Sequence, residues 1–546
     1  MFTPPFSPYP PITTSLCPEW IQYSQSDSSM ALFHLLYTHS LPRNYSLHSI
    51  LTSQFITSHI TQIMDIVTDP VCRNRELLRM HLLQLCQQDP NLSLSILLFT
   101  TINWTQRRIR DNYLFIQKIR LIAANQIDFQ SISWEINSDI RPLHTRINNT
   151  ISFFDTLFSL SSFLYSIPIH QRQSLFTLHC GRINQIAFQS IGGVSFPIHP
   201  TTIIKRIIPS SSFVLSTKSR CPCVVDLELQ GTFQQSPTSS ESWIDWLEED
   251  RSDGGSSSGS ISPSTDTIDS INTNNSTNTI DSINTTHHRI IIKTNDFMRQ
   301  EEMASNLIHE IQQILTDSHI HINLHPYSVI PFNDHNAIID YLEGFISFHQ
   351  LKRTIYSKGF QSIHTFFNHL FQQQPQRFNT FQHNFITSIA AYSIISFVLQ
   401  LKDRNDGNIL IDQFGNVVHI DYGFFLSNSP GNIHFETAPF KLNNDFIQLI
   451  GIPESSNFLL FQTLCTQIYN ALVSHQTRIL SIVKLFAIHY PHLPCFSNDP
   501  QQTIQQLTLR LNPQIQTDRF VQQLIQQAFG SWTTHLYDSF QFYLTG

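Results

Sequence analysis

The chain of 546 residues is poor in charge: Asp, Glu, Lys and Arg make up 13% of it, whereas hydrophobic residues make up 41%. Gln, Asn, Ser and His are expected to occupy much of the surface that Lys and Glu usually occupy. We interpret this composition as a coding bias rather than as a sign of particular chemistry. The formal net charge is −8, so the molecule as a whole lacks a positive field. This excludes broad attraction to nucleic acid or to anionic membrane, and any membrane contact has to come from a local patch.

The sequence also lacks the marks of a secreted or membrane-spanning protein. No apolar run reaches the ~18 residues of a transmembrane helix, and the longest, Ile389 to Leu401, has the length of one buried helix. The first residues lack the basic-then-apolar order of a secretory signal. Of the 8 cysteines only Cys221 and Cys223 are closely spaced, and no His pair completes a zinc site there. We expect a soluble, cytoplasmic protein that meets lipid peripherally.

Composition divides the chain into four parts. Residues 1–27 are Pro-rich and predicted to be disordered, and residues 28–175 carry the apolar periodicity of a helical domain. Residues 190–345 predict a β-rich lobe, interrupted at 233–287 by a Ser-, Thr- and Asn-rich linker that buries too little apolar surface to fold. Helical patterns dominate residues 346–546.

Short alternating segments predict the strands of the β-rich lobe, and a helix is expected from about Arg299 to Leu315. A single hairpin, at 409–421, interrupts the helical lobe. The expected strands are Phe213–Leu215, Cys223–Leu229, Arg289–Lys293, Ile320–Leu324 and Tyr327–Pro331. The predicted class is therefore α+β, with a β-rich N-lobe and a helical C-lobe arranged as in a protein-kinase-like bilobal fold, preceded by an α-helical domain.

The densest chemical signal is the stretch from Asp403 to Gly423, in which Asn408 precedes the hairpin and Asp421 follows it. The hairpin brings Asn408 and Asp421 to the same end. An amide oxygen and a carboxylate there can hold Mg²⁺ against ATP phosphates, and an Asp shortly before can orient or accept a hydroxyl proton. Together, after a β-rich lobe, these features indicate phosphoryl transfer.

This stretch resembles the catalytic and activation loops of the phosphoinositide kinases, most closely the type III phosphatidylinositol 4-kinases of the beta class. The most specific part is Ser427 to Leu442, which reads SNSPGNIHFETAPFKL. The resemblance covers residues 195–230 and 289–546 well, and residues 73–125 less specifically. It implies ATP with Mg²⁺ (or Mn²⁺) as cofactors and phosphatidylinositol in membranes as substrate. It also implies small GTPases and adaptor proteins as partners, at the Golgi.

The resemblance implies a role for individual residues of the nucleotide site. Lys293 binds the ATP phosphates and pairs with Glu301 on the following helix. The phosphate-covering loop, the adenine hinge and the pocket wall are expected to comprise Ser216, Lys218, Tyr327, Ile339, Asp340 and Leu342. Tyr327 is equally consistent with a plain core tyrosine.

The remaining roles concern the transfer itself. Asn408 and Asp421 are expected to hold the metal. Asp403 or His419 orients or deprotonates the inositol hydroxyl, and both are expected in the catalytic set with Lys293, Glu301 and Arg404. Lys441 is expected to contact the headgroup.

The catalytic loop departs from the family's Asp-Arg-His-Asn-Gly-Asn, because Asn405 stands where the family has His. An amide cannot take a proton at neutral pH, and general-base help is worth roughly 10²- to 10⁴-fold, so we expect slower turnover rather than none.

Between Asp421 and Lys441 the activation segment has no Lys or Arg, and only His434 could add positive charge. A headgroup with extra phosphates should meet several cations, so unphosphorylated phosphatidylinositol is the better match. The 4-position follows from the resemblance alone. A phosphatidylinositol 3-kinase, a weaker protein-kinase reading and a catalytically weak pseudokinase scaffold stay open as alternatives, the last supported only by Asn405.

Overall fold

The computed structural model describes residues 56, 60–68, 75–104, 106–126, 141–188, 192–215, 220–230, 285–429, 438–497, 499–512 and 517–529. The Pro-rich start, nearly all of the predicted linker, Ser216, Lys218 and His434 lie outside the described residues.

The N-terminal part of the chain is helical, as predicted. Its helices are α4 (Ile60–Thr68), α5 (Arg75–Gln88), α6 (Pro90–Asn103), α7 (Gln106–Asp111), α8 (Tyr113–Gln126), α9 (Arg141–Tyr165) and α10 (Ile169–Ala187). Apolar residues of α4, α5, α6 and α8 form one core, which also includes Leu485 of the C-terminal lobe. The helical layer is thereby packed against the kinase-like lobes.

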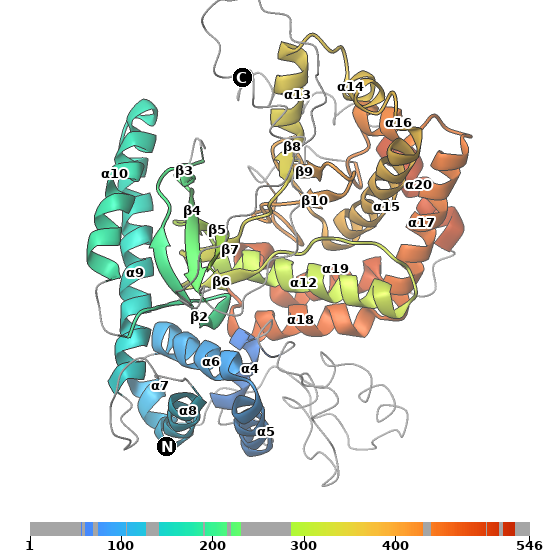
Figure 1. The fold of residues 1–546 in the computed structure, drawn as a ribbon. Coiled ribbons are helices and arrows are strands. Elements are labelled where there is room, and N and C mark those ends of the chain that lie inside the picture. The colour runs from blue at the N-terminus through green and yellow to red at the C-terminus, as the bar shows by residue number, and fades with distance from the viewer. Residues whose placement is uncertain are drawn as a thin grey trace, which may run out of the picture.

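An antiparallel sheet follows, with β1 (Val194–Phe196), β2 (His199–Ile207), β3 (Phe213–Val214), β4 (Cys223–Gln230), β5 (Thr285–Lys293), β6 (Val329–Pro331) and β7 (Ala337–Asp340). The order is β1-β2-β4-β5-β7-β6, and β3 pairs with β4. Side chains alternate between two faces of a strand, and β5 uses both. Ile290 and Ile292 join the core formed with α9 and α10, whereas Ile291 packs against the core of α12 (Met298–Asp317) on the other face. In Figure 1, α9 and α10 lie on one side of the strands and α12 on the other.

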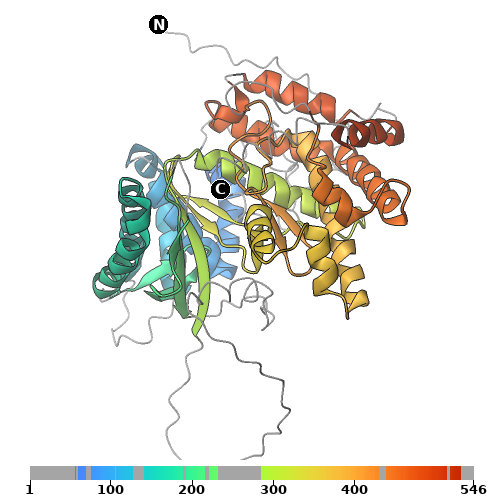
Figure 2. The ribbon, with the colours of Figure 1, turned by 90° about the horizontal axis from the view of Figure 1, so that it is seen from above.

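The C-terminal part is helical apart from one small sheet. Its helices are α13 (Phe348–Ser357), α14 (Ile363–Leu370), α15 (Pro375–Leu399), α16 (Asn444–Ile450), α17 (Ser456–Ser474), α18 (Gln476–His489), α19 (Pro500–Arg510) and α20 (Thr517–Phe529). The sheet has the order β10-β9-β8, from β8 (Phe345–Ser347), β9 (Ile409–Asp412) and β10 (Val417–His419). Figure 2 shows the green strands on one side of the molecule and these yellow-to-red helices on the other. The predicted α+β bilobal class is confirmed.

The length and hydropathy of the described helices indicate whether any of them could cross a membrane. None of them alone is long and apolar enough to cross a membrane, and one sharply bent pair, α17 with α18, meets the length and composition criteria together.

One predicted strand is wrong, and four strands were missed. Residues Ile320–Leu324 are not a strand, because the side chain of Gln312 on α12 takes the place of a sheet neighbour. Its amide donates to the Ile322 carbonyl at 2.6 Å and its oxygen accepts from the Leu324 N–H at 2.7 Å. The missed strands are β2, which begins with polar residues, and the short β1, β7 and β8.

Candidate active site

Lys293 ends β5 at the centre of a carboxylate cluster. Its Nζ lies 3.1 Å from Asp296 Oδ2, 3.7 Å from Glu301 Oε2 and 3.5 Å from Asp421 Oδ1. Burial alone would lower the pKa of Lys293, but these three carboxylates outweigh it and raise the pKa. The ammonium is therefore charged at neutral pH and joins the first turn of α12 to the segment after β10.

Glu301 is also held by two tyrosines. The Tyr327 hydroxyl donates to Glu301 Oε1 at 2.8 Å, and the Tyr422 N–H donates to Oε2 at 3.0 Å. The rings of Tyr327 and Tyr422 stack with centroids 6.1 Å apart. Burial raises the pKa of the Glu301 carboxyl, and Lys293 opposes that rise. Tyr327 is thus buried beneath the Lys293–Glu301 pair and holds its orientation.

Asp403 begins the catalytic loop in the left-handed region, with φ of 58°. Its Oδ1 accepts from Asn405 Nδ2 at 2.9 Å, and its Oδ2 lies 3.3 Å from Asn408 Nδ2, which also donates to the Asp403 carbonyl at 2.9 Å. Asn405 Oδ1 in turn accepts from the Gly407 N–H at 2.8 Å. Asn405 is therefore engaged at both ends within the loop and orients Asp403.

Arg404 joins the catalytic loop to Asp421 through main-chain contacts. Its guanidinium donates to the carbonyls of Lys402, Ile420 and Asp421 at 2.9, 2.8 and 2.6 Å. The Ile420 N–H donates to the Asn408 carbonyl at 3.0 Å, so the hairpin does bring Asn408 and Asp421 to one end. All three hydrogen bonds of the Arg404 guanidinium go to main-chain carbonyls, so we assign Arg404 a positioning role.

Asn408 and Asp421, which are predicted to hold the metal, present hard oxygen donors. The amide nitrogen of Asn408 is held by the carbonyl and carboxylate of Asp403, and this contact fixes the orientation of the amide group. Lys293 most strongly, and then Arg404 and Arg220, lower the pKa of Asp421 against the effect of burial, so it is ionised at neutral pH. An amide oxygen and a carboxylate fit Mg²⁺ or Mn²⁺ bound jointly with phosphate oxygens.

The two candidate bases differ in their surroundings. His419 is 4% exposed, and its ring stacks on Tyr392 with centroids 4.3 Å apart. Burial, followed by Arg404 and Lys441, lowers its pKa well below 6.5. Its imidazole is neutral, buried and a poor proton acceptor, whereas Asp403 is partly exposed. The geometry favours Asp403.

The predicted adenine hinge follows β7. Asp340 points its carboxylate at His288 of β5, with Oδ1 2.8 Å from Nε2. Neither the N–H nor the carbonyl of Leu342 makes a hydrogen bond to any described residue, so its main chain can offer a donor and an acceptor to a planar base. Ile339 is 6% exposed and packs in the same core as Tyr327.

Lys441 is not at the surface, where a headgroup ligand was expected. Its side chain is 4% exposed, and Nζ pairs with Asp406 Oδ1 at 2.6 Å. Lys352 of α13 binds the other Asp406 oxygen at 2.6 Å and Asp445 of α16 at 2.5 Å. Burial alone would raise the pKa of Asp406, but Lys441 and Lys352 outweigh it and lower the pKa. Contact between Lys441 and a headgroup stays a prediction that requires this pair to open.

Sequence reasoning missed three residues that hold the site together. Asp296 pairs with Lys293 and, at 2.5 Å, with Arg220. Gln300 donates to the carbonyls of Tyr422 and Gly423 at 3.0 and 2.7 Å. The third is Asp406. The sequence places it in the catalytic loop but does not predict that it pairs with Lys441 and Lys352. The only local signal was the spacing of Asp296, three residues after Lys293.

The lobes and the site together have the arrangement of a bilobal kinase-like fold. A buried Lys–Glu pair in the sheet lobe faces the Asp403–Asn408 loop and the Asn408–Asp421 pair of the helical lobe. Residues 287–497 match the family model described as phosphatidylinositol 3- and 4-kinase, so this part of the chain is similar to that family.

Known relatives narrow the class further. The chain is 37% identical over 265 residues to "Phosphatidylinositol 4-kinase" of Dictyostelium discoideum, covering 47% of this chain and 22% of the relative. It is 34% identical over 265 residues to "Phosphatidylinositol 4-kinase beta 2" of Arabidopsis thaliana, covering 47% and 23%. It is 32% identical over 260 residues to "Phosphatidylinositol 4-kinase beta" of Xenopus laevis, covering 47% and 32%. The resemblance to the beta class is confirmed for this half of the chain, although the match spans a third or less of each of these relatives.

Asn405→Ala is expected to lower kcat and leave the KM for ATP nearly unchanged, because the variant removes the contact from Asn405 that orients Asp403 and does not touch the nucleotide residues. A hydrogen bond to a charged group is worth ~1.5–3 kcal/mol, which corresponds to about 10- to 100-fold in rate. Steady-state kinetics on lipid vesicles would measure both constants. Unchanged kcat would show that Asn405 does not position Asp403, and Asn405→His tests whether another donor restores the rate.

Proposed function

We propose that the protein is a phosphatidylinositol 4-kinase, which transfers the γ-phosphate of ATP to the 4-hydroxyl of phosphatidylinositol and makes phosphatidylinositol 4-phosphate. The observation that carries the proposal is the junction of the lobes at Lys293. There the ammonium lies 3.7 Å from Glu301 and 3.5 Å from Asp421, beside the end of the hairpin that bears Asn408. The similarity to relatives named phosphatidylinositol 4-kinases supports this substrate.

In this reaction the inositol hydroxyl oxygen forms a bond to the γ-phosphorus while the bond to the β-bridging oxygen breaks and ADP leaves. Bound ATP supplies the phosphoryl group, and Mg²⁺ supplies charge neutralisation on its phosphates. Lys293, held by Glu301, binds phosphate oxygens. Asn408 and Asp421 would hold the metal, and Asp403 accepts the hydroxyl proton. Ser216 and Lys218 are proposed to cover the phosphates.

The environment of the activation segment supports an unphosphorylated headgroup. Lys441 is already neutralised by Asp406, and no other Lys or Arg lies between Asp421 and Lys441 in the sequence. A headgroup with added phosphates would bring two or more further charges to a segment in which only His434 could add positive charge. From the resemblance we also propose a cytoplasmic protein peripheral on membranes, at the Golgi, with small GTPases and adaptor proteins as partners.

Competition between headgroups tests the substrate proposal. Vesicles containing equal amounts of phosphatidylinositol, its 4-phosphate and its 4,5-bisphosphate would be incubated with labelled ATP, and the products separated by position. We expect label in phosphatidylinositol 4-phosphate. A 3-phosphate product would instead establish the 3-kinase alternative, and label mainly in polyphosphorylated lipids would contradict the argument from the activation segment.

A further inference from the structure

A pocket of about 510 Å³ lies in the C-terminal lobe, beside the catalytic loop. Its described walls include Lys402, both ends of the activation segment at 427–429 and 438–439, and side chains of α19 and α20. Lys402 directly precedes Asp403, which accepts the hydroxyl proton in the proposed reaction. The pocket therefore begins next to the catalytic loop, and its volume lies in the ~300–1,000 Å³ range of pockets that hold small molecules.

Hydrogen bonds join these walls to one another. The Lys402 N–H donates to the Phe424 carbonyl at 2.9 Å, which connects the catalytic loop to the start of the activation segment. The hydroxyls of Ser427 and Thr503 lie 2.7 Å apart, which connects that segment to α19. The pocket is thus bounded by elements that contact one another directly.

The described wall of this pocket is positively charged. Lys402 and Arg510 line it, and none of its described lining residues is Asp or Glu. The Arg510 Nε donates to the Val398 carbonyl at 2.8 Å, and of the two terminal nitrogens, neither of which has a described partner, only Nη2 is fully enclosed. Burial lowers the pKa of Arg510 to about 10, and no carboxylate opposes this effect. The guanidinium is still charged at neutral pH, so it can donate to an anion in the pocket.

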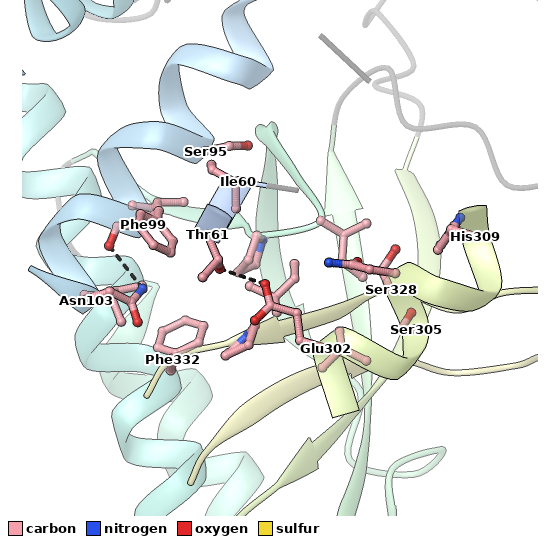
Figure 3. Close-up of a pocket in the computed structure, with 18 residues that line it drawn as sticks. Ile60, Thr61, Ser95, Phe99, Asn103, Glu302, Ser305, His309, Ser328 and Phe332 are labelled. Carbon is pink, nitrogen blue, oxygen red and sulfur yellow. Dashed lines mark hydrogen bonds between the residues drawn. The ribbon is translucent and has the colours of Figure 1, made fainter. Parts of the chain in front are cut away.

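A smaller cavity, of about 140 Å³, lies between the N-terminal helices and the N-lobe and has the opposite character (Figure 3). Its described wall contains the Glu302 carboxylate, which accepts from the Thr61 hydroxyl at 2.7 Å, and no Lys or Arg. An anion there would meet a carboxylate and no cation. Of these two pockets, the one in the C-terminal lobe suits an anion.

Most of the other described residues in the wall of the larger pocket carry amides or hydroxyls. Gln502 and Gln506 of α19 and Gln527 of α20 are exposed, and their amide groups make no hydrogen bond to any described residue. Each amide offers both donors and an acceptor, which matches the hydroxyl groups of a polyol. Charge and hydrogen-bonding groups together therefore fit a ring that bears several hydroxyls and one phosphate.

We propose that this pocket binds the headgroup of the lipid substrate, with Arg510 donating to its phosphodiester and the amides of α19 and α20 bonding to its ring hydroxyls. This assignment rests on the proposed function. It supplies a cation from outside the activation segment, whose own Lys441 is paired with Asp406. The position beside the catalytic loop favours the headgroup of the substrate over a free phosphate ester.

Binding of soluble probes to the full chain tests the pocket independently of turnover. Ligand-observed NMR would titrate glycerophosphoinositol, which has the phosphodiester and the ring, myo-inositol, which lacks the phosphodiester, and dimethyl phosphate, which lacks the ring. We expect saturable binding of glycerophosphoinositol, at least tenfold tighter than that of either other probe, because it alone can bond to both the guanidinium and the amides. Equal binding of dimethyl phosphate would indicate a simple anion site and overturn the proposal.

Variants locate the binding. Arg510→Gln should weaken binding of glycerophosphoinositol about 10- to 100-fold, and Gln506→Leu about fivefold. The matched controls lie outside the pocket: Gln505→Leu, beside Gln506, and Arg519→Gln, exposed on α20, should leave binding unchanged. Thermal midpoints would verify folding, and Gln506→Leu carries the test if Arg510→Gln does not fold, because Gln506 is exposed.

Kinetics on vesicles of phosphatidylinositol in phosphatidylcholine connect the pocket to the reaction. We expect Arg510→Gln and Gln506→Leu to raise the KM for the lipid by the same factors with the KM for ATP unchanged, and glycerophosphoinositol to compete with the vesicles. Lipid product with an unchanged KM in both variants, or probe binding that does not compete, would overturn this inference and leave the proposed function standing. No lipid product from the unchanged protein would overturn both.

Discussion

Replacing Asp421 by alanine is expected to reduce phosphoryl transfer by about 10³-fold or more, because a catalytic metal supplies several kcal/mol of charge stabilisation that is lost with its ligand. Asn408 alone would remain as a protein ligand. The fold should tolerate the change, since Lys293 keeps Asp296 and Glu301 within 3.1 and 3.7 Å. Rates at saturating ATP, with circular dichroism to monitor folding, would measure the effect.

The control is Asp518→Ala, which removes an exposed aspartate from the first turn of α20, outside the site. It should retain the activity of the unchanged protein. Substantial turnover by Asp421→Ala, in a variant whose thermal midpoint is unchanged, would refute the assignment of Asp421 as metal ligand.

Asp406→Ala is expected to destabilise the protein by about 3–5 kcal/mol, because it removes a buried carboxylate that two lysines share. Lys441 would lose its carboxylate at 2.6 Å, whereas Lys352 would keep Asp445 at 2.5 Å. Denaturant unfolding monitored by fluorescence would measure the difference. Asp445→Ala is the matched variant, because it removes the more exposed carboxylate of the network, and its cost should be clearly smaller.

The stabilisation by Asp406 should depend on pH in one direction. The pKa of this carboxyl is lowered in the folded protein, so its contribution is present above the unfolded value of about 3.9 and is lost as pH falls through the folded value. The difference in unfolding free energy between the unchanged protein and Asp406→Asn should therefore be constant near neutrality and shrink below about pH 4. A difference that persisted at lower pH would show that charge is not its source.

Local sequence features predicted the parts of the site that depend on short stretches of chain. The hairpin at β9 and β10 fixes where Asn408 and Asp421 lie, and the strand before Lys293 with the helix after it fixes the Lys293–Glu301 pair. Pairings between distant segments left no such signal. The contact of Lys441 with Asp406 joins residues 35 positions apart and depends on Lys352 of another helix.

The errors in the fold have the same origin. Ile320–Leu324 has the composition of a strand, yet its main chain bonds to the side chain of Gln312 instead of to a neighbouring strand. From the sequence, Asn405 was interpreted as the loss of a possible base. Its side chain in fact contacts Asp403 and the Gly407 N–H, and it orients Asp403.

The most direct test of the proposed function is transfer of labelled phosphate from Mg²⁺-ATP to phosphatidylinositol vesicles by the unchanged protein and by Asp421→Ala, with the position of the product resolved. The account predicts phosphatidylinositol 4-phosphate from the unchanged protein and none above background from the variant. ATP binding without any lipid product would contradict it, and would favour a scaffold that keeps the kinase fold without its activity.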